Sequence, residues 1–262
     1  MSSLNLNPDE YPWKIEARVV GYKKVDPNQF MTLDHEQVRN VNYSGRKLEM
    51  FTAIGSRFEG CRFDKVRFGN FVFGGGMELS EYIECSFDSA NFDDYLGGFA
   101  RFVRCSFRDI DLRRWRCYET ELIDSVFTGR LEECIFYGTV PEKDRPWVGR
   151  EKNEFRGNDF SGCDLVDVAF RSGIDLSQQR LPTGPEYLYL PDAAVAIERA
   201  RTAVHEWYDV GLREVGLTFL ASIEFELEGG QRQLLLRADD YYGFEALPQE
   251  MIDGVFAALR SG

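Results

Sequence analysis

Residues 56–68 read SRFEGCRFDKVRF and place a phenylalanine at every fifth position. Neither ordinary period explains this spacing. An amphipathic helix repeats its apolar residues at i, i+3, i+4 and i+7, and a half-buried strand repeats them at every second residue. A five-residue repeat therefore requires a different structure.

The five-residue step continues far beyond this stretch. It runs from position 58 to 73, resumes at Tyr82 and continues to 127, and a third block follows from 155 to 170. The large apolar members that we expect to form the core ladder are Phe58, Phe63, Phe68, Phe73, Phe87, Phe92, Phe102, Phe107, Leu112, Leu122, Phe127, Phe155, Phe160, Leu165 and Phe170. Weaker members extend the series backward through Leu48, Tyr43, Val38 and Leu33.

Each unit also has a preference two residues before its centre, where small or medium residues such as Ser56, Cys61 and Val66 stand. The positions between are mostly charged or polar. An inward, outward, inward triplet is a three-residue strand, and the two remaining residues make a corner. Repetition of a strand and a corner produces a coil whose turns stack about 4.8 Å apart through parallel backbone ladders.

This pattern resembles the pentapeptide-repeat family, whose motif is a small residue, a polar residue, Leu or Phe, and two variable residues. The stretches CSFDSANFDDY, CSFRDIDLRRW and NDFSGCDLVDVAF match it. The resemblance covers residues 48–181. It implies a mainly β fold, a right-handed quadrilateral parallel β-helix with four units per coil, and on the order of five to seven coils.

We expect three regions: an N-terminal cap and first irregular coil over 1–47, the β-helix over 48–182, and a small α+β module over 183–262. Residues 13–25 alternate in polarity and predict a strand that covers the first coil. In the C-terminal module, Asp192 predicts the start of a helix. Residues 217–227 alternate as a strand, and Gly229-Gly230 with residues 231–238 would complete a hairpin. A last helix is expected over 248–260.

The repeat breaks twice, between 73 and 82 and between 127 and 136, and each spacing of nine is one residue short of two units. The second break leads into an inserted loop over 138–152, where two prolines disfavour a strand. Its candidate partner-binding residues are Glu142, Lys143, Asp144, Arg145, Trp147 and Arg150. Two interpretations of Trp147 stay open: it is an exposed contact for a partner, or it folds back and seals the break.

The six cysteines are expected in the core. Five stand at the small inward position and Cys117 at a central one, and no C-x-x-C pair occurs. Cysteine packs as a small apolar residue, and a buried thiol has a raised pKa. This placement disfavours disulfides and a zinc site.

No catalytic motif is present, and we expect neither an enzyme nor a cofactor. The sequence lacks a phosphate-binding loop and a G-x-S-x-G motif. The adjacent carboxylates at 93–94, 132–133 and 239–240 are interpreted as solvated surface. The segment ADDYYGFE at 238–245 is a polar and aromatic cluster and a candidate ligand or partner site.

The charge of the chain and its targeting signals bear on nucleic-acid binding and on localisation. The net charge is −13, and residues 48–181 carry 18 basic and 24 acidic side chains, a net −6. An acidic chain disfavours direct nucleic-acid binding. The chain shows no basic and apolar leader pattern and no apolar run of about 18 residues, so we expect a cytoplasmic protein without a membrane span.

The resemblance also implies a function. Some family members imitate the width and charge of DNA, bind DNA gyrase and protect it from quinolones or peptide toxins. The projecting loop favours this antibiotic-resistance role. A run of arginines departs from a clean DNA mimic: Arg101, Arg104, Arg108, Arg113, Arg114 and Arg116.

The sequence therefore predicts a non-enzymatic scaffold for protein–protein interaction, with DNA gyrase as the specific candidate partner. The alternative is a C-terminal module that binds or senses a small molecule and uses the rod as its mount. That module is also a candidate homodimer surface.

Overall fold

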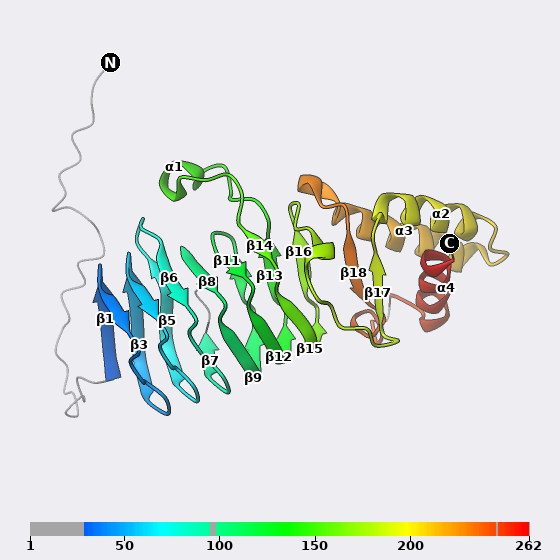
Figure 1. Cartoon of the computed structure of the whole chain (residues 1–262). Helices are drawn as coiled ribbons and strands as arrows, with labels where there is room; N and C mark the ends of the chain where they lie inside the picture. Colours follow the sequence, from blue (N-terminus) through cyan, green and yellow to red (C-terminus); the bar gives the residue numbers. More distant parts are fainter. Residues whose placement is uncertain (1–28, 95–97, 245, 262) are drawn as a thin grey trace, which may run out of the picture.

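The computed structural model describes residues 29–94, 98–244 and 246–261. The five-residue repeat forms a parallel β-solenoid, and helices gather at its C-terminal end (Figure 1). The expected mainly β solenoid fold is confirmed. The expected N-terminal strand over 13–25 lies outside the described residues.

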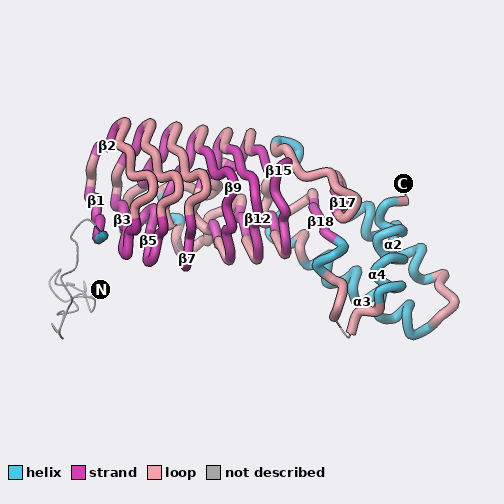
Figure 2. Tube along the Cα trace, turned by 90° about the horizontal axis from the view of Figure 1, so that it is seen from below, coloured by secondary structure: helices cyan, strands magenta, loops and turns pink. Residues whose placement is uncertain are grey.

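Three parallel sheets form the walls of the solenoid (Figure 2). The first sheet has the order β1 (Phe30–Asp34), β3 (Lys47–Ile54), β5 (Arg67–Gly75), β7 (Asn91–Asp94), β9 (Ser106–Arg113), β12 (Val126–Glu132) and β15 (Asp159–Val166). The second contains β2 (Gln37–Arg39), β4 (Arg57–Glu59), β6 (Ser80–Ile83), β8 (Ala100–Val103), β11 (Glu121–Ile123) and β14 (Phe155–Arg156). The third contains β10 (Arg116–Cys117), β13 (Ile135–Tyr137) and β16 (Ala169–Arg171).

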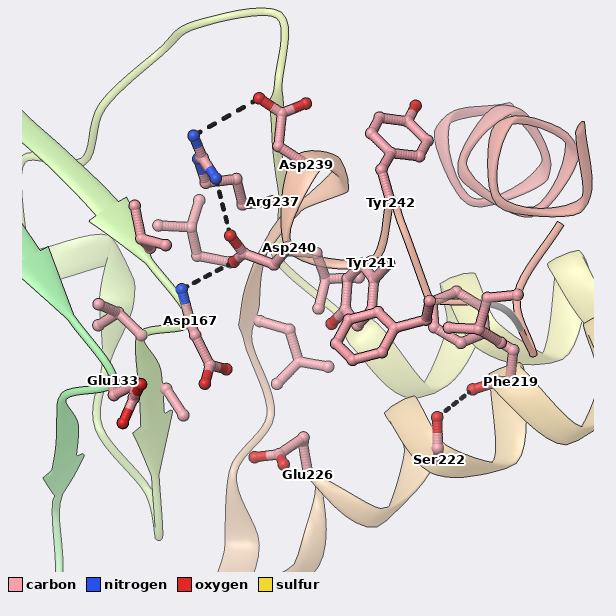
Figure 3. A pocket seen from close by; sticks show the side chains of 18 of the residues that line it. Glu133, Asp167, Phe219, Ser222, Glu226, Arg237, Asp239, Asp240, Tyr241 and Tyr242 are labelled. Carbon is pink, nitrogen blue, oxygen red and sulfur yellow. Dashed lines mark hydrogen bonds and ion pairs between the residues drawn. The ribbon is translucent and has the colours of Figure 1, made fainter. Parts of the chain in front are cut away.

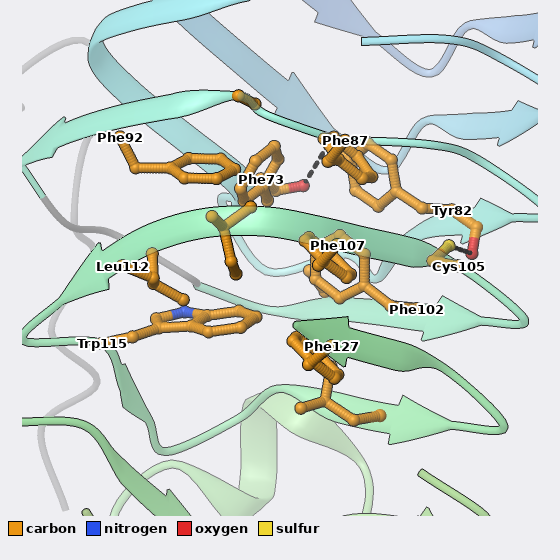
Figure 4. Close-up of a cluster of buried hydrophobic side chains, with 14 of the residues drawn as sticks. Phe73, Tyr82, Phe87, Phe92, Phe102, Cys105, Phe107, Leu112, Trp115 and Phe127 are labelled. Atoms are coloured by element: carbon orange, nitrogen blue, oxygen red, sulfur yellow. Dashed lines mark hydrogen bonds between the residues drawn. The ribbon is translucent and has the colours of Figure 1, made fainter. Parts of the chain in front are cut away.

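The aromatic side chains stack in columns inside these walls (Figure 4). In one column, consecutive rings are 4.8–4.9 Å apart and nearly parallel, in the order Tyr43, Phe63, Phe87, Phe107, Phe127 and Phe160. This distance equals the spacing of hydrogen-bonded strands, because each ring is carried by the coil directly above the last. All fifteen members of the expected core ladder are buried.

Each break in the repeat is a change in coil length. Phe102 lies opposite Leu122, one ordinary coil of 20 residues. Phe58 lies opposite Tyr82, so the first break adds four residues to its coil. The second break has a different origin, because β12 lacks one residue relative to β9 and the ladder shifts at Gly129.

Gly129 shows why the shorter coil needs a glycine. Its φ is +101°, and a Cβ placed there would lie 2.2 Å from the carbonyl oxygen of Ile110. Only a residue without a side chain allows the two backbones to approach this closely.

The six thiols are unpaired and buried within the solenoid. Burial raises the pKa of the Cys134 and Cys163 thiols to about 12. These cysteines are core residues, as their position in the repeat predicts.

The C-terminal region has its own apolar core. It contains β17 (Tyr187–Leu190), α2 (Ala193–His205), α3 (Val210–Phe225), β18 (Leu234–Arg237) and α4 (Gln249–Arg260), with short 3-10 turns at Glu228–Gly230 and Ala238–Asp240. A further 3-10 turn, Leu176–Gln178, precedes this region, and its Leu176 packs in the solenoid core. The helix that begins after Asp192 is confirmed, because that carboxylate accepts from the backbone N–H of Val195. The last helix is confirmed as α4.

The expected strand over 217–227 is wrong, because the segment is helical through Phe225, the last residue of α3. Asp209 caps this helix by accepting from the backbone N–H of Leu212. The buried face carries Phe219, Leu220 and Ile223, which recur at helical spacing. β18 consequently pairs with β17, in an antiparallel ladder, and not with the preceding segment.

The C-terminal region caps the open end of the solenoid. The side chain of Gln231 accepts from the backbone N–H groups of Gly173 and Ile174, both at 3.0 Å. The hydroxyl of Tyr187 accepts from the N–H of Leu165 at 2.9 Å. These bonds satisfy backbone groups that an uncovered sheet edge would leave available for aggregation. In the described part of the chain, no helix is both long and apolar enough to span a membrane.

Candidate functional site

Two features of the described structure could contact another molecule: the inserted loop and a cleft at the end of the solenoid. The base of the loop is held by buried polar contacts. Asn153 donates from Nδ2 to the carbonyl oxygens of Tyr118 and Tyr137, both at 2.8 Å. Arg150 Nε lies 3.2 Å from a carboxylate oxygen of Glu121, whose side chain is buried. These contacts fix the point at which the loop leaves the solenoid.

The tip of the loop carries the short helix α1 (Arg145–Val148), which stands away from the solenoid (Figure 1). Glu142, Lys143 and Trp147 are exposed, with Trp147 60% accessible to solvent. Asp144 and Arg145 are half-buried. The interpretation in which Trp147 folds back onto the coil is therefore wrong. Of the six residues singled out in the sequence, Arg150 anchors the loop and does not lie at its tip.

The run of arginines between 101 and 116 does not form a basic patch, because carboxylates of adjacent coils lie beside it. Arg104 lies 2.9 Å from Glu84, and Arg114 lies 3.0 Å from Glu133. Arg101, Arg108 and Arg113 also contact carboxylates about one coil away. Each such surface pair adds little stability. Together they cancel the positive charge that the linear sequence suggests.

The cleft has a volume of about 1110 Å³ and lies between the last coils and the C-terminal region (Figure 3). Its walls come from the solenoid corners near Glu133 and Asp167, from α3, and from the segment after β18. Asp239, Tyr242 and Phe244 of the ADDYYGFE cluster line it.

Ion pairs and hydrogen bonds join the two sides of the cleft. Arg237 contacts Asp164 of the solenoid at 3.4 Å and Asp240 at 2.8 Å. Asp240 in turn accepts from the backbone N–H of Asp167 at 3.0 Å. Arg171 of the solenoid donates two hydrogen bonds to Glu226 of the α3 C-terminus, at 2.5 and 2.6 Å.

The interpretation of Asp239-Asp240 as solvated surface is wrong for Asp240. Its side chain is only 13% exposed, and burial raises the pKa of this carboxyl despite the nearby guanidinium of Arg237. Glu132 and Glu133 point to different arginines, Arg130 and Arg114, as separate surface pairs.

Tyr241 lies at the back of the cleft (Figure 3). Its ring packs edge-on against Phe219 with centroids 4.8 Å apart. Burial, with the negative charges of Asp240, Glu226 and Asp167, raises the pKa of Tyr241. Within the described ranges its hydroxyl has no hydrogen-bond partner.

Sequence reasoning found only the 238–245 part of the cleft. Asp167, Glu214 and Phe219 come from a solenoid corner and from a helix, and no local motif links them. Among the residues that the structure describes, no three His, Cys, Asp or Glu side chains are grouped to hold a metal ion.

Comparison with known proteins finds similarity to solved structures. No family model matches the chain, and no curated protein matches it. A structure of QnrB1, a plasmid-mediated fluoroquinolone resistance protein, is 16% identical to this chain and has a TM-score of 0.17. The match covers 58% of this chain and 79% of the other. A TM-score of this size carries no argument about function, so the function of this chain is inferred from its own residues.

Proposed function

We propose that this chain is a non-enzymatic, cytoplasmic pentapeptide-repeat scaffold that binds a protein partner through the loop over 138–152. The exposure of Trp147 on a held loop is the observation that supports this most directly. Tryptophan is enriched among residues that dominate binding energy. The contacts of Arg150 and Asn153 hold the loop base in place before binding, which lowers the entropy cost of association.

DNA gyrase is the specific partner that we propose. The solenoid segment over 48–181 carries a net −6, and the arginines that argued against a DNA mimic are offset by carboxylates of adjacent coils. A rigid acidic rod can enter a groove shaped for DNA, because electrostatic complementarity steers such an encounter. Quinolone protection would follow from occupation of the enzyme's DNA site.

The test is a gyrase supercoiling assay in the presence of a quinolone. We expect the protein to restore supercoiling, and Trp147→Ala to need about 30-fold more protein for the same effect, because loss of a central aromatic contact costs about 2 kcal/mol or more. Tyr208→Ala, which removes an aromatic side chain that is fully exposed elsewhere, should behave as wild type.

Different failures would mean different things. Neither inhibition nor rescue by the wild-type protein would end the gyrase proposal. The scaffold proposal would then depend on affinity purification with mass spectrometry, in which Trp147→Ala must lose the captured partner. Equal capture by wild type and Trp147→Ala would overturn the role of the loop.

The cleft supports a second candidate function, in which the C-terminal region binds a small molecule and the rod is its mount. Its volume of about 1110 Å³ is slightly above the usual range of small-molecule sites, which is about 300–1000 Å³. Two ion pairs cross the cleft, Arg171 with Glu226 and Arg237 with Asp164. A ligand bound there would therefore lie at the junction of the solenoid and the C-terminal region.

A further inference from the structure

The chemistry of the cleft, on the assumption that the second candidate function is correct, restricts the ligand to one class. Two of its carboxylates are unbalanced, which means that no basic side chain in the described structure pairs with them. Asp167 lies at a corner between β15 and β16, and Glu214 lies on α3. No described arginine, lysine or histidine forms an ion pair with either carboxylate. The other acidic residues that line the cleft have arginine partners: Glu132, Glu133, Glu226, Asp239 and Asp240. The cleft thus retains negative charge on two different walls.

The remaining surface suits an organic cation. Phe244 is 60% exposed at the cleft and Tyr242 is also exposed. Aromatic faces attract ammonium groups within about 6 Å. The Tyr241 hydroxyl, which has no partner among the described residues, offers an oxygen as a hydrogen-bond acceptor for an N–H group. Apolar residues such as Val168 and Val215 lie among these polar groups and can contact methylene carbons.

Other ligand classes fit less well. An anion would be repelled by the two unbalanced carboxylates. The arginines that it could contact in the cleft already form ion pairs with carboxylates. A chelated metal ion needs several ligands around one point, and the described residues contain no such group. A cleft with negative charges on two of its walls instead matches a chain with separated positive charges.

We propose that the cleft binds a linear polyamine, a flexible cation in which two or more amino groups are separated by methylene chains. One ammonium group pairs with Asp167 and another with Glu214. The methylene segment covers the apolar residues between them, and the aromatic side chains of Tyr242 and Phe244 lie over the bound cation.

The test is isothermal titration calorimetry of the full chain with spermidine. We expect Asp167→Asn and Glu214→Gln each to weaken binding about tenfold, because each change replaces a carboxylate that pairs with an ammonium group by a neutral amide. Asn tolerates the left-handed backbone of position 167, where φ is +50°. Glu36→Gln, an exposed change in the first coil at the opposite end of the solenoid, should leave the affinity within twofold. Unchanged thermal melting of the variants in the absence of ligand shows that each is folded.

Matched ligands separate charge from shape. We expect 1,8-diaminooctane to bind and its neutral analogue 1,8-octanediol not to bind, and we expect affinity to fall as salt is raised. Equal binding of diamine and diol, or an equal loss of affinity with Glu36→Gln, would overturn the proposal. The proposal would also be overturned if an arginine-rich peptide bound to the protein and spermidine did not.

Failure of this inference can be told from failure of the candidate function on which it rests. A thermal-shift screen of anionic and neutral metabolites on the same protein serves this purpose. A shift by one of them that Phe244→Ala abolishes would reject the polyamine and retain a ligand-binding cleft. No shift by any metabolite and no binding of spermidine would reject both.

Discussion

Phe107→Ala is expected to lower the free energy of unfolding by about 3–5 kcal/mol. Phe107 is fully buried, and its ring is stacked 4.8 Å from both Phe87 and Phe127. Strands above and below are joined by backbone hydrogen bonds, so the coil cannot close around the missing ring. A cavity remains in the middle of the column. Urea unfolding followed by circular dichroism measures the change.

The control for this prediction is Phe225→Ala, at a position 64% exposed at the end of α3. Its effect should stay within about 0.5 kcal/mol, as for other surface substitutions. A loss of less than 1 kcal/mol for Phe107→Ala would show that the solenoid repacks, and would contradict the rigid column described above.

Gly129→Ala is expected to cost about 3 kcal/mol or more, or to prevent folding. The added Cβ would lie 2.2 Å from the Ile110 carbonyl oxygen and 2.7 Å from the Ile110 nitrogen. Both are backbone atoms of the neighbouring coil and cannot rotate away. The positive φ adds about 1–2 kcal/mol for any residue with a side chain. Equilibrium unfolding again provides the measurement.

Gly45→Ala separates the two contributions. Gly45 also has a positive φ, +74°, but nothing lies within 4 Å of the position of its Cβ. It should cost only the backbone term, about 1–2 kcal/mol. Similar losses at positions 45 and 129 would show that the close approach between coils does not limit substitution.

Much of the solenoid could be predicted from residue spacing because each five-residue unit meets the same environment. A large residue at the unit's centre stacks on its equivalent one coil away, as Phe63 does on Phe87. The exception at Cys117, which is small for a central position, is also explained by a near neighbour. The large side chain of Trp115, two residues earlier, is buried and fills the core there. A five-residue period in the sequence is therefore sufficient to predict a fold that repeats the same unit.

The C-terminal region shows where a local pattern fails. Residues 217–227 alternate in polarity, yet Phe219, Leu220 and Ile223 also recur at helical spacing. The two periods coincide over this short segment, so sequence alone supports both. Packing against α2 and α4 and the cap at Asp209 favour the helix.

The sequence by itself determined the solenoid, its buried thiols and the position of the inserted loop, because these depend on which residue types recur at a fixed step. Only the tertiary structure decided that Trp147 is exposed, that the arginines from 101 onward are offset by carboxylates of adjacent coils, and that Asp167, Glu214 and Tyr241 share a cleft. These relations join residues tens of positions apart. They depend on coil length and on how the C-terminal region docks, and no local spacing encodes either.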